Sequence, residues 1–500
     1  MSLIDNLATG FGVAFTVVNL LYALLGAVLG TLIGILPGLG PVATVAMLLP
    51  VTYTLEPTTA LIMLAGIYYG AQYGGSTTAI LVNLPGEASS VVTTLDGYQM
   101  AQRGRAGQAL AVAAYGSLFA GIVGTLLLAA LAPALASVAI GFGAAEYFSL
   151  MLLGLIGAVA LASGSVLKAI AMILFGLLLG SIGTDINSGV DRYTFGVFEL
   201  GDGIDFVVVA MGVFGLTEIL RNVVRPETRD LGTAAIGGMR LSRDEVRRSV
   251  PAVFRGSALG AAMGLLPGGG ALLSSFAAYT IEKRISKHPQ EFGKGAIEGV
   301  AAPESANNAA AQSSFVPMLT LGIPANATTA LLMGAMMIHN IQPGPQVMSS
   351  HPELFWGLIA SMFIGNVMLV ILNLPMINIW VKLLSIPYRL LYPAILVFVT
   401  VGVFSIQNST FLILLMLGFG LLGYLLSLLD FEPAPLLLGF ILGPMVEDNF
   451  RRAMLISAGD PTTFVTRPVS AVLLGLAVAL LVLLAFPSIR KSREQAFQED

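Results

Sequence analysis

Long stretches of this chain carry no Asp, Glu, Lys or Arg, and their apolar character predicts helices that span a membrane. These stretches cover residues 6–55, 106–145, 256–281, 305–352 and 390–429. About 20 consecutive apolar residues cross one bilayer core, so each stretch accommodates at least one span. The pattern predicts an all-α polytopic membrane protein with about 10–12 transmembrane helices, surrounded by a lipid bilayer.

Two helix-breaking clusters interrupt these stretches. The first reads Gly34-Ile-Leu-Pro-Gly-Leu-Gly-Pro41, and the second, 230 positions later, reads Gly264-Leu-Leu-Pro-Gly-Gly-Gly-Ala271. Every backbone polar group must be bonded in lipid, so such breaks persist only where protein or a wet cavity lines them. About 14 apolar residues separate Pro41 from Glu56, roughly 21 Å of helix, which is too short for a core of about 30 Å. Each cluster therefore predicts a re-entrant hairpin.

A second helix-breaking segment follows in each half of the chain. In the first half, the run Tyr69–Thr78 leads into Asn83-Leu-Pro-Gly86, and in the second half the run Glu304–Ser314 leads into Gly322-Ile-Pro-Ala325. The prolines of these two segments lie 239 positions apart. Two pairs of breaks at nearly one offset indicate a duplicated unit that contains discontinuous helices.

Basic residues gather in a few segments, and this gives a topology. Residues 221–255 carry eight arginines and residues 283–294 carry four Lys or Arg, so both segments are expected in the cytoplasm. The acidic loop 185–205 is expected in the periplasm. The first hairpin returns to a side without basic residues and the second returns to the lysine-rich side, so the two halves are predicted to be inverted repeats.

These signals predict how the chain is organised. The parts are a first inverted repeat at 1–220 (hairpin near 34–41, broken helix near 70–90, scaffold helices 109–220), a cytoplasmic Arg-rich linker at 221–252, a second inverted repeat at 253–487 (hairpin near 264–271, broken helix near 304–330, scaffold helices 353–487) and a cytoplasmic tail at 488–500. The N-terminus is expected in the periplasm.

The composition agrees with a membrane protein and limits which kinds of partner and site are expected. Hydrophobic residues make up 56% of the chain and charged residues 10%, against about 25% charged in a soluble domain. There is no cysteine, which removes disulfides and thiolate metal sites. The net charge of −4 gives no reason to expect a nucleic-acid partner. Glu87, near Arg103 and Arg105, is expected to be an interfacial charge.

The breaks themselves have the chemistry of an anion site. None of them contains Lys or Arg, so a bound anion must be held by other groups. Broken helices supply these groups, because unpaired N–H groups and a partial positive charge face the break at a helix N-terminus. Glycines allow close backbone approach, and hydroxyls and amides add donors. The predicted substrate-binding residues are Pro37, Gly38, Gly40, Ser76, Thr77, Thr78, Asn83, Pro267, Gly268, Gly269, Gly270, Ser313, Ser314, Pro324, Thr328 and Thr329.

A multiply charged anion in a low dielectric requires cations that bind with it, which favours symport. Unwound carbonyls, together with Asn307, Asn308, Asn326 and Glu304, are the oxygen ligands that suit a sodium ion. Proton coupling through Glu304 or His339 is the alternative. No catalytic residue, cofactor or metal centre is predicted.

At this point the motifs resemble a known family. Gly34-Ile-Leu-Pro-Gly-Leu-Gly-Pro41, Tyr73-Gly-Gly-Ser-Thr-Thr78 followed by Asn83-Leu-Pro-Gly86, and Pro303-Glu-Ser-Ala-Asn-Asn-Ala309 look like signature stretches of the large membrane subunit of tripartite tricarboxylate transporters, the TctA-type family. The likeness extends to about residue 470. It implies a bacterial inner-membrane permease that takes up carboxylates with a cation, together with a periplasmic solute-binding protein and a small membrane subunit. The sequence leaves the carboxylate and a homodimer open.

Other classes of protein fit the sequence less well. The chain has no His-Glu-x-x-His, no Gly-x-Ser-x-Gly and no Walker-type phosphate loop, so we expect neither an enzyme nor an ATP-driven pump. A channel also uses carbonyls and glycines. An ion or anion channel, or a permease energised by another chain, is therefore the alternative to the symporter.

The topology can be tested by labelling single cysteines, since the chain has none of its own. We expect cysteines near Arg240 and Ser286 to react from the cytoplasm, and cysteines near Thr54 and Ser349 to react from the periplasm, because the halves are inserted oppositely. Labelling of Thr54 and Ser286 positions from one side would rule out the inverted repeat.

Overall fold

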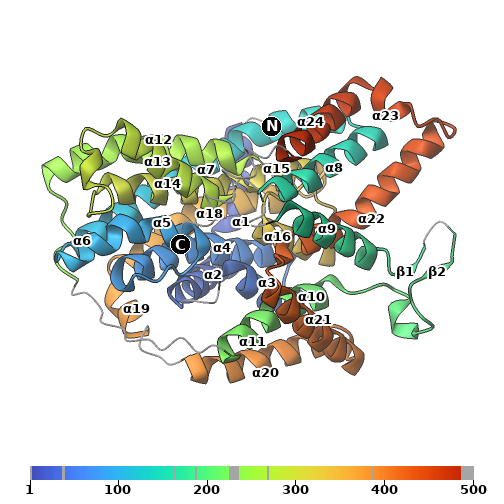
Figure 1. The fold of residues 1–500 in the computed structure, drawn as a ribbon, viewed down its shortest axis with the longest axis horizontal. Coiled ribbons are helices and arrows are strands. Elements are labelled where there is room, and N and C mark those ends of the chain that lie inside the picture. The colour runs from blue at the N-terminus through green and yellow to red at the C-terminus, as the bar shows by residue number, and fades with distance from the viewer. Residues whose placement is uncertain are drawn as a thin grey trace.

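The computed structural model describes residues 3–36, 40–161, 165–185, 188–224, 236–266, 270–383 and 388–485. The regular structure of these residues is helical except for two short strands, β1 (Gly183–Thr184) and β2 (Asp191–Arg192), which form an antiparallel pair. Figure 1 shows the helices packed into one assembly, with the two strands at one end of its long axis. The all-α class that the sequence predicts is confirmed.

The helices follow one another with short connections in both halves of the chain. The first half contains α1 (Leu3–Ala14), α2 (Val17–Ile35), α3 (Pro41–Thr52), α4 (Pro57–Val82), η1 (Ala88–Ser90), α5 (Val91–Thr93), η2 (Thr94–Tyr98), α6 (Gln99–Gln102), α7 (Ala106–Ile140), α8 (Ala144–Leu161), α9 (Val166–Gly180), η3 (Phe198–Leu200), α10 (Phe206–Ala210), η4 (Met211–Leu216) and α11 (Thr217–Val224). The second half contains α12 (Arg243–Gly264), α13 (Ala271–Ile285), η5 (Pro289–Glu291), α14 (Glu298–Ser313), α15 (Phe315–Leu321), α16 (Ala327–Ile338), α17 (Val347–Ser350), α18 (Pro352–Asn373), α19 (Ile377–Leu383), α20 (Tyr388–Gln407), α21 (Thr410–Leu428), α22 (Pro433–Ile456), α23 (Thr463–Thr466) and α24 (Pro468–Ala485).

Several of these helices are suited to a bilayer. Within the described ranges, five are long and apolar enough to cross a membrane: Val17–Ile35, Ala106–Ile140, Phe206–Val223, Pro352–Asn373 and Thr410–Leu428. The protein is therefore a polytopic membrane protein. Helices α3 and α13, which follow the Pro-Gly clusters, have 12 and 15 residues, or about 18 and 22 Å, and are shorter than a bilayer core. The tips before them, 37–39 and 267–269, lie outside the described residues.

Three glycines spaced four residues apart bring α2 into close contact with α4. A methyl group on any of them would lie 2.3–2.5 Å from a backbone oxygen of α4, so only glycine permits this approach. The glycines are Gly26, Gly30 and Gly34, and they face the carbonyl oxygens of Met63, Ile67 and Ala71 in that order.

Helix α12 meets α14 in the same way in the second half. A methyl group on its glycines would lie 2.1–2.4 Å from a backbone oxygen of α14. These glycines are Gly256, Gly260 and Gly264, and they face the carbonyl oxygens of Ala302, Ala306 and Ala310. The two glycine triplets are 230 positions apart, as the Pro-Gly clusters are. One helix pair is thus built twice, which supports the proposed repeat.

The second breaks also share one geometry, but the non-helical segment of each is shorter than the sequence predicts. Tyr69–Thr78 lies inside the continuous helix α4, and Glu304–Asn308 lies inside α14, so neither run is unwound. Gly74 serves packing, since a methyl group there would lie 2.3 Å from Thr31 O of α2. The chain leaves the helix only at Asn83 and Gly322, both in the left-handed region (φ 57° and 69°).

Each second break ends in a capping box. Glu87 caps η1 with Ser90, and Asn326 caps α16 with Thr329. In both boxes the backbone N–H of the cap donates to the hydroxyl three residues on, over 3.4 Å to Ser90 Oγ and 2.9 Å to Thr329 Oγ1. All these residues match at the offset of 239. The two breaks are therefore the same local structure, formed by different caps.

The two halves are packed through exchanged helices. Helix α7 of the first half packs on α14 of the second, and α18 of the second half packs on α4 of the first. Figure 1 shows α7 beside α12, α13 and α14. The two exchanged helices share the pattern Ser-x-Phe-x-Gly-x-Val at Ser117–Val123 and Ser361–Val367. Neither half encloses its own broken helix alone.

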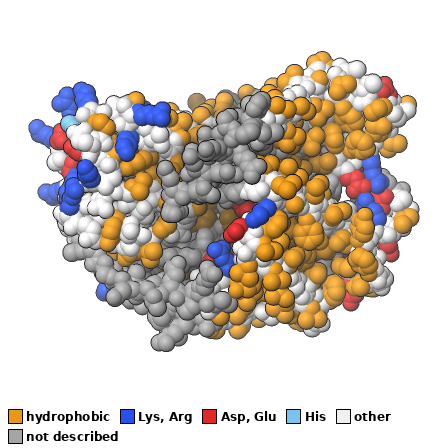
Figure 2. All heavy atoms as spheres, viewed as in Figure 1, with side chains coloured by type: hydrophobic (Ala, Val, Ile, Leu, Met, Phe, Trp, Pro, Cys, Tyr) orange, Lys and Arg blue, Asp and Glu red, His pale blue; other side chains and the backbone are white. Residues whose placement is uncertain are grey.

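Charged side chains gather at the two ends of the long axis. Figure 2 shows Lys and Arg over the α12–α13 end and a mixed group at the β1–β2 end, with hydrophobic side chains over much of the described surface between them. Ion pairs occur at both ends, and a further pair, Arg221–Glu218, lies on α11 between them. At the first end they are Arg105–Glu245, Arg248–Glu298 and Arg255–Glu282, and at the other end they are Arg192–Glu447 and Arg451–Asp185. This separation supports the expectation that residues 185–205 and the Arg-rich linker face opposite sides.

The glycine contacts predict a stability loss. In Gly260→Ala a methyl group would lie 2.1 Å from Ala306 O, and we expect a cost on the order of 1–3 kcal/mol because two backbones must separate. Thermal unfolding of the purified protein in detergent measures this. Gly418→Ala is the control, because nothing lies within 4 Å of a methyl group there and alanine favours helix. An unchanged unfolding midpoint for Gly260→Ala would contradict the close contact.

Candidate functional site

Helix N-termini from both halves of the chain meet at one cavity of about 350 Å³. We call it the central cavity. Besides two residues of α4, Tyr68 and Gln72, it is lined by the caps of η1, α3, α13, α16 and α22. These caps are Glu87, Gly40, Gly270, Asn326 and Glu432. Because a helix N-terminus carries unpaired N–H groups and roughly half a positive charge, this arrangement attracts an anion.

The two hairpin helices contribute glycine caps. Gly40 and Gly270 stand one residue before α3 and α13, and both line the central cavity. A methyl group on Gly40 would meet nothing within 4 Å, so the position faces open space. The sequence prediction of Gly40 and Gly270 as site residues therefore agrees with their place in the structure.

The two second breaks contribute polar caps. Asn326 Oδ1 accepts from the Thr329 N–H, and Asn326 Nδ2 donates to the Tyr68 hydroxyl, each over 2.9 Å. The Ser89 hydroxyl lies within hydrogen-bond distance of the Glu87 carboxylate and of Gln72 Oε1. The expectation that Glu87 is an interfacial charge is wrong, because its side chain lines the cavity. These hydrogen bonds connect both breaks to α4.

The charge of this cavity is unusual for an anion site. Among the described residues that line it there is no Lys, Arg or His. Two of the five caps, Glu87 and Glu432, are carboxylates. The helix N-termini favour an anion, while the carboxylates favour a cation. The cavity is therefore suited to an anion that arrives together with positive charge.

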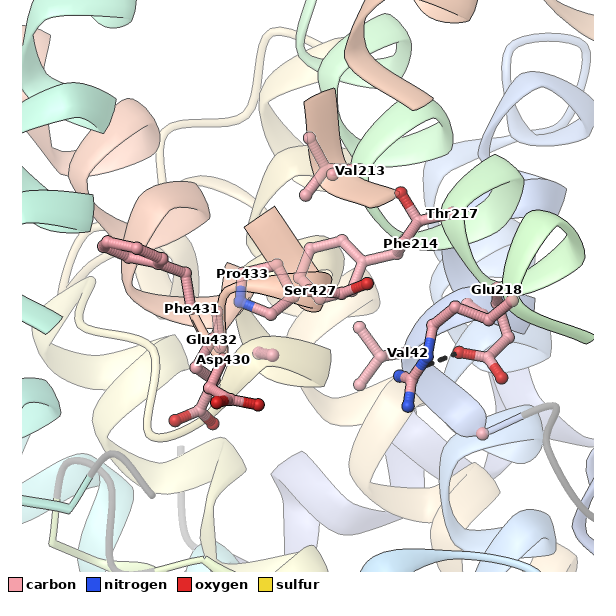
Figure 3. Close-up of a pocket in the computed structure, with 16 residues that line it drawn as sticks. Val42, Val213, Phe214, Thr217, Glu218, Ser427, Asp430, Phe431, Glu432 and Pro433 are labelled. Carbon is pink, nitrogen blue, oxygen red and sulfur yellow. Dashed lines mark ion pairs between the residues drawn. The ribbon is translucent and has the colours of Figure 1, made fainter. Parts of the chain in front are cut away.

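A wider cavity of about 590 Å³ adjoins the central cavity (Figure 3). Gly40, Val42, Ala327, Glu432 and Ala434 line both, so the two cavities lie side by side. The wider cavity lies between the start of α3, the η4–α11 segment and the end of α21, and Figure 3 shows Phe214 and Phe431 within it.

The far end of the wider cavity holds one ion pair. Arg221 is the basic residue among its described lining, and its guanidinium lies 3.8 Å from Glu218. The dashed line in Figure 3 marks this pair. We call this space the Arg221 cavity. It connects the central cavity to the helix end that enters the Arg-rich linker.

A third cavity of about 350 Å³, the Asp205 cavity, lies toward the acidic loop. Helices α16 and α22 line the central cavity with their early residues, such as Thr328 and Leu438, and this cavity with later ones. Between them Phe206 fills the space over Gly334, where a methyl group would lie 2.0 Å from its ring, and it stacks with Phe440 at 6.5 Å. The aromatic pair separates the two cavities.

Asp205, which gives the third cavity its name, caps α10. Its carboxylate accepts from the Val207 N–H over 2.7 Å and from the Tyr53 hydroxyl over 3.2 Å. Burial raises the pKa of Asp205, and these hydrogen bonds oppose the rise. Tyr53 follows the first hairpin, so this contact joins the hairpin to the acidic loop.

Glu304 lies on α14, away from the lining of the central cavity, and its side chain is fully buried. Its carboxylate accepts from Ser76 Oγ over 2.5 Å, from the Thr93 hydroxyl and from Asn307 Nδ2 over 3.4 Å. All three donors are neutral, and no Lys or Arg of the described chain pairs with it. Ser76 and Thr93 belong to the first half, so this carboxylate is held across the two halves.

The other predicted site residues either line the central cavity, lie elsewhere in the described structure or fall outside it. Thr328 and Asn326 line the central cavity with Gly40 and Gly270. Asn307 and Asn308 lie with Glu304 on α14, fully buried. Eight predicted substrate residues do not line the cavity: Ser76, Thr77, Thr78, Asn83, Ser313, Ser314, Pro324 and Thr329. Five predicted residues lie outside the described part: Pro37, Gly38, Pro267, Gly268 and Gly269.

A physical reason accounts for the residues that do not line the cavity. The hydroxyls of Thr77, Thr78, Ser313 and Ser314 each donate to a carbonyl three or four residues earlier in their own helix. Short hydroxyl side chains bond in this way whenever the helix continues through them. The hydroxyl residues in the sequence therefore do not indicate which residues line the cavity.

Sequence reasoning missed Tyr68, Gln72, Ser89 and Glu432. The last is the clearest case, because Glu432 followed by Pro433 is a cap with proline in the first turn of α22. Proline at this position marks a helix start, and that signal was present in the sequence.

An integral membrane protein whose broken helices enclose a polar cavity has the architecture of a secondary transporter. The family model described as "Tripartite tricarboxylate transporter TctA family" matches residues 20–438, and the chain belongs to this family. The resemblance that the motifs carry is thus confirmed.

Two relatives come from Agrobacterium vitis. One, described as "Uncharacterized 52.8 kDa protein in TAR-I ttuC' 3'region", is 58% identical over 500 residues, which is 100% of both chains. The other, described as "Uncharacterized protein in TAR-II ttuC' 3'region", is 58% identical over 241 residues, which is 48% of this chain and 100% of the relative. No solved structure matches the chain.

Proposed function

We propose that this protein takes up a citrate-like di- or tricarboxylate across the bacterial inner membrane by cation symport. It acts as the large permease subunit of a tripartite system, with a periplasmic solute-binding protein and a small membrane subunit. Membership of the family supports the permease and its two kinds of partner. The sodium ion is the coupling cation, and the proton is the alternative.

One observation carries the proposal. Five helix N-termini from two similar halves converge on one cavity whose described lining has no basic side chain. A carboxylate of several charges there is held by backbone N–H groups, and by Asn326, Thr328 and Tyr68, which also contribute side-chain hydrogen bonds. This geometry favours a small polyanion over an apolar or cationic substrate.

The need for cations follows from the carboxylates of the site. Glu87 at the cavity and the buried Glu304 place carboxyl groups close to where the substrate binds, and like charges repel strongly at low dielectric. Cations that bind together with the substrate offset this repulsion. By linkage, each ligand then raises the affinity for the other by the same factor.

Alternating access agrees with the three cavities. The central cavity shares five lining residues with the Arg221 cavity, and Phe206 with Phe440 lies between it and the Asp205 cavity. By the positive-inside rule the Arg221 side is cytoplasmic. In our proposal the structure is therefore an inward-open state, and displacement of Phe206 from Gly334 opens the other side. A channel would need both barriers open together.

Gly40→Leu tests the substrate site. A Cβ at this position would meet nothing within 4 Å, so the leucine side chain would start in open space and extend into the central cavity. We expect uptake of labelled citrate into proteoliposomes with the complete system to fall at least about tenfold, which is more than 1.4 kcal/mol, with an unchanged unfolding midpoint.

Gly418→Leu is the matched control, because it too has open space within 4 Å but lies on α21 outside the central cavity. It should transport normally. Normal uptake by Gly40→Leu would show that the substrate binds elsewhere. Uptake that does not saturate with citrate would favour the channel.

Coupling is tested through the sodium dependence of uptake. We expect uptake to rise steeply with external sodium, and Asn326→Ala to shift this dependence to higher sodium, because the substituted cap weakens binding of both ligands. Ser242→Ala is the matched control. It also removes an N-cap with a capping box, at a cost of about 1 kcal/mol, but from α12, far along the chain from the cavity lining.

The proton alternative predicts a different result. Glu304→Gln keeps the shape of the buried side chain and removes its charge. If protons drive uptake, external pH decides the rate and this variant loses the pH dependence. Uptake that responds to neither gradient would exclude symport and leave the channel or a permease driven by another chain.

A further inference from the structure

A second group of buried polar side chains lies where α4, α7, α14 and α18 meet, and it is absent from the described lining of the central cavity. We call it the polar junction. Its members are at most 3% exposed, and they lie on three of the four helices around glycines of α7 and α18. They are Tyr69, Tyr73, Asn308, Gln312 and Asn366.

Asn308 presents an oxygen without a donor. Its Nδ2 has three acceptors within hydrogen-bond distance for its two hydrogens: Glu304 O at 3.1 Å, Asn307 Oδ1 at 2.7 Å and Ser117 Oγ at 2.8 Å. Two of these acceptors are carbonyl-type oxygens, so the amide cannot be turned round without placing oxygen against oxygen. Asn308 Oδ1 has no partner in the described structure, and a buried acceptor without a partner is costly.

Gln312 lies one helical turn further along α14. Both its Oε1 and its Nε2 lack a partner among the described residues, although the side chain is fully buried. Residues four apart lie on one helix face with Cβ atoms about 5–6 Å apart, so Asn308 and Gln312 point to the same side. That side faces α7, where a methyl group on Gly124 would lie 2.7 Å from Gln312 Cβ.

Asn366 brings a third oxygen from α18. Its Nδ2 donates to Met362 O over 2.8 Å, which leaves Oδ1 directed at α7. A methyl group on Gly121 would lie 2.2 Å from this oxygen. Gly121 is located between Ser117, which contacts Asn308, and Gly124, which contacts Gln312. Asn366 Oδ1 accepts only a long bond of 3.5 Å, from the Tyr73 hydroxyl.

The charge of the surroundings identifies the ligand. Glu304 lies one turn before Asn308 on the same helix, and no Lys, Arg or His belongs to the junction. Oxygen atoms beside a carboxylate repel an anion and attract a cation. Divalent ions prefer several carboxylates, whereas neutral amide and hydroxyl oxygens suit a monovalent ion.

We propose that the polar junction binds a small monovalent cation, with Asn308 Oδ1, Gln312 Oε1 and Asn366 Oδ1 as ligands. Its role in coupling rests on the proposed symport, but the binding itself does not. The chain Glu304–Asn307–Asn308 connects the ion to the carboxylate that Ser76 and Thr93 hold from the other half. Binding in the junction therefore acts on the contact between the two halves.

The duplication shows why one such site is expected. At the offset of 239, Asn308 and Gln312 correspond to Tyr69 and Tyr73. The helix pairs around them are similar, but amide oxygens occur on α14 and aromatic hydroxyls on α4. The first half therefore lacks the two strongest oxygen ligands of the second.

The test measures binding of sodium alone to the purified full chain in detergent. Unfolding is followed by tryptophan fluorescence while sodium replaces choline at constant ionic strength. A ligand that binds the folded state raises the unfolding midpoint with its concentration. We expect this rise in the wild type, and an apparent sodium Kd at least about tenfold higher in Gln312→Met, which keeps the size of the side chain and removes its oxygen.

The matched control is Gln108→Met on α7. Gln108 also has a buried oxygen without a partner in the described structure, but it lies in the first turn of α7, away from the junction. It should keep the wild-type sodium response. Gln312→Glu, which adds a charged oxygen, should bind sodium more tightly. This variant tests the sodium site if Gln312→Met fails to fold.

Two results would overturn the proposal. One is a wild-type midpoint that sodium does not change, and the other is a sodium response that Gln312→Met and Gln312→Glu both leave at the wild-type value. The junction would then hold water only. Citrate uptake by the same variants distinguishes failure of this proposal from failure of the proposed function. Uptake that persists without a sodium site would contradict only the site proposed here. A sodium site without uptake would contradict only the transport proposal.

Discussion

The rule that backbone polar groups must be bonded inside a bilayer determines the rest of this structure. A helix can be broken at membrane depth only where protein or water surrounds the break. The glycines of α2 and α12 make this possible, because they allow α4 and α14 to approach within backbone contact. Covered in this way, the breaks can turn their free N–H groups inward. The central cavity is the result, and the anion binding that we propose there relies on the backbone rather than on basic side chains.

Each half of the molecule depends on the other. Helices α7 and α18 cover the broken helix of the opposite half, and Glu304 of the second half is held by hydroxyls of the first. A charge that enters this contact changes how the halves fit together. On α4 the two groups use different residues, Tyr68 and Gln72 at the central cavity and Tyr69 and Tyr73 at the polar junction.

The helical class that the sequence predicted is confirmed, since long uncharged runs have strong local effects, and helices end near both second breaks, at Asn83 and Gly322. The sequence predicted Gly40, Gly270, Asn326 and Thr328 at the cavity. It did not predict Tyr68 or Gln72, because which face of α4 meets the breaks depends on the glycine contacts with α2. It placed Glu87 at the interface because nearby arginines suggested it, whereas the capping box turns the chain back into the protein. The match of Ser117–Val123 with Ser361–Val367 is visible in the sequence. Only the packing of α7 and α18 on the opposite halves shows that the two segments occupy corresponding places.

The glycine contacts also limit how the molecule can move. A carbonyl seated on a glycine at every turn keeps α2 in register with α4, and α12 in register with α14, so neither pair can slide along its partner. Each pair behaves as a rigid body. The chain leaves these bodies at Asn83 and Gly322, which both adopt the left-handed conformation and are followed by only three further residues before the next cap. A rotation about these two residues would reorient η1 and α16 while leaving the glycine contacts of the helix pairs intact.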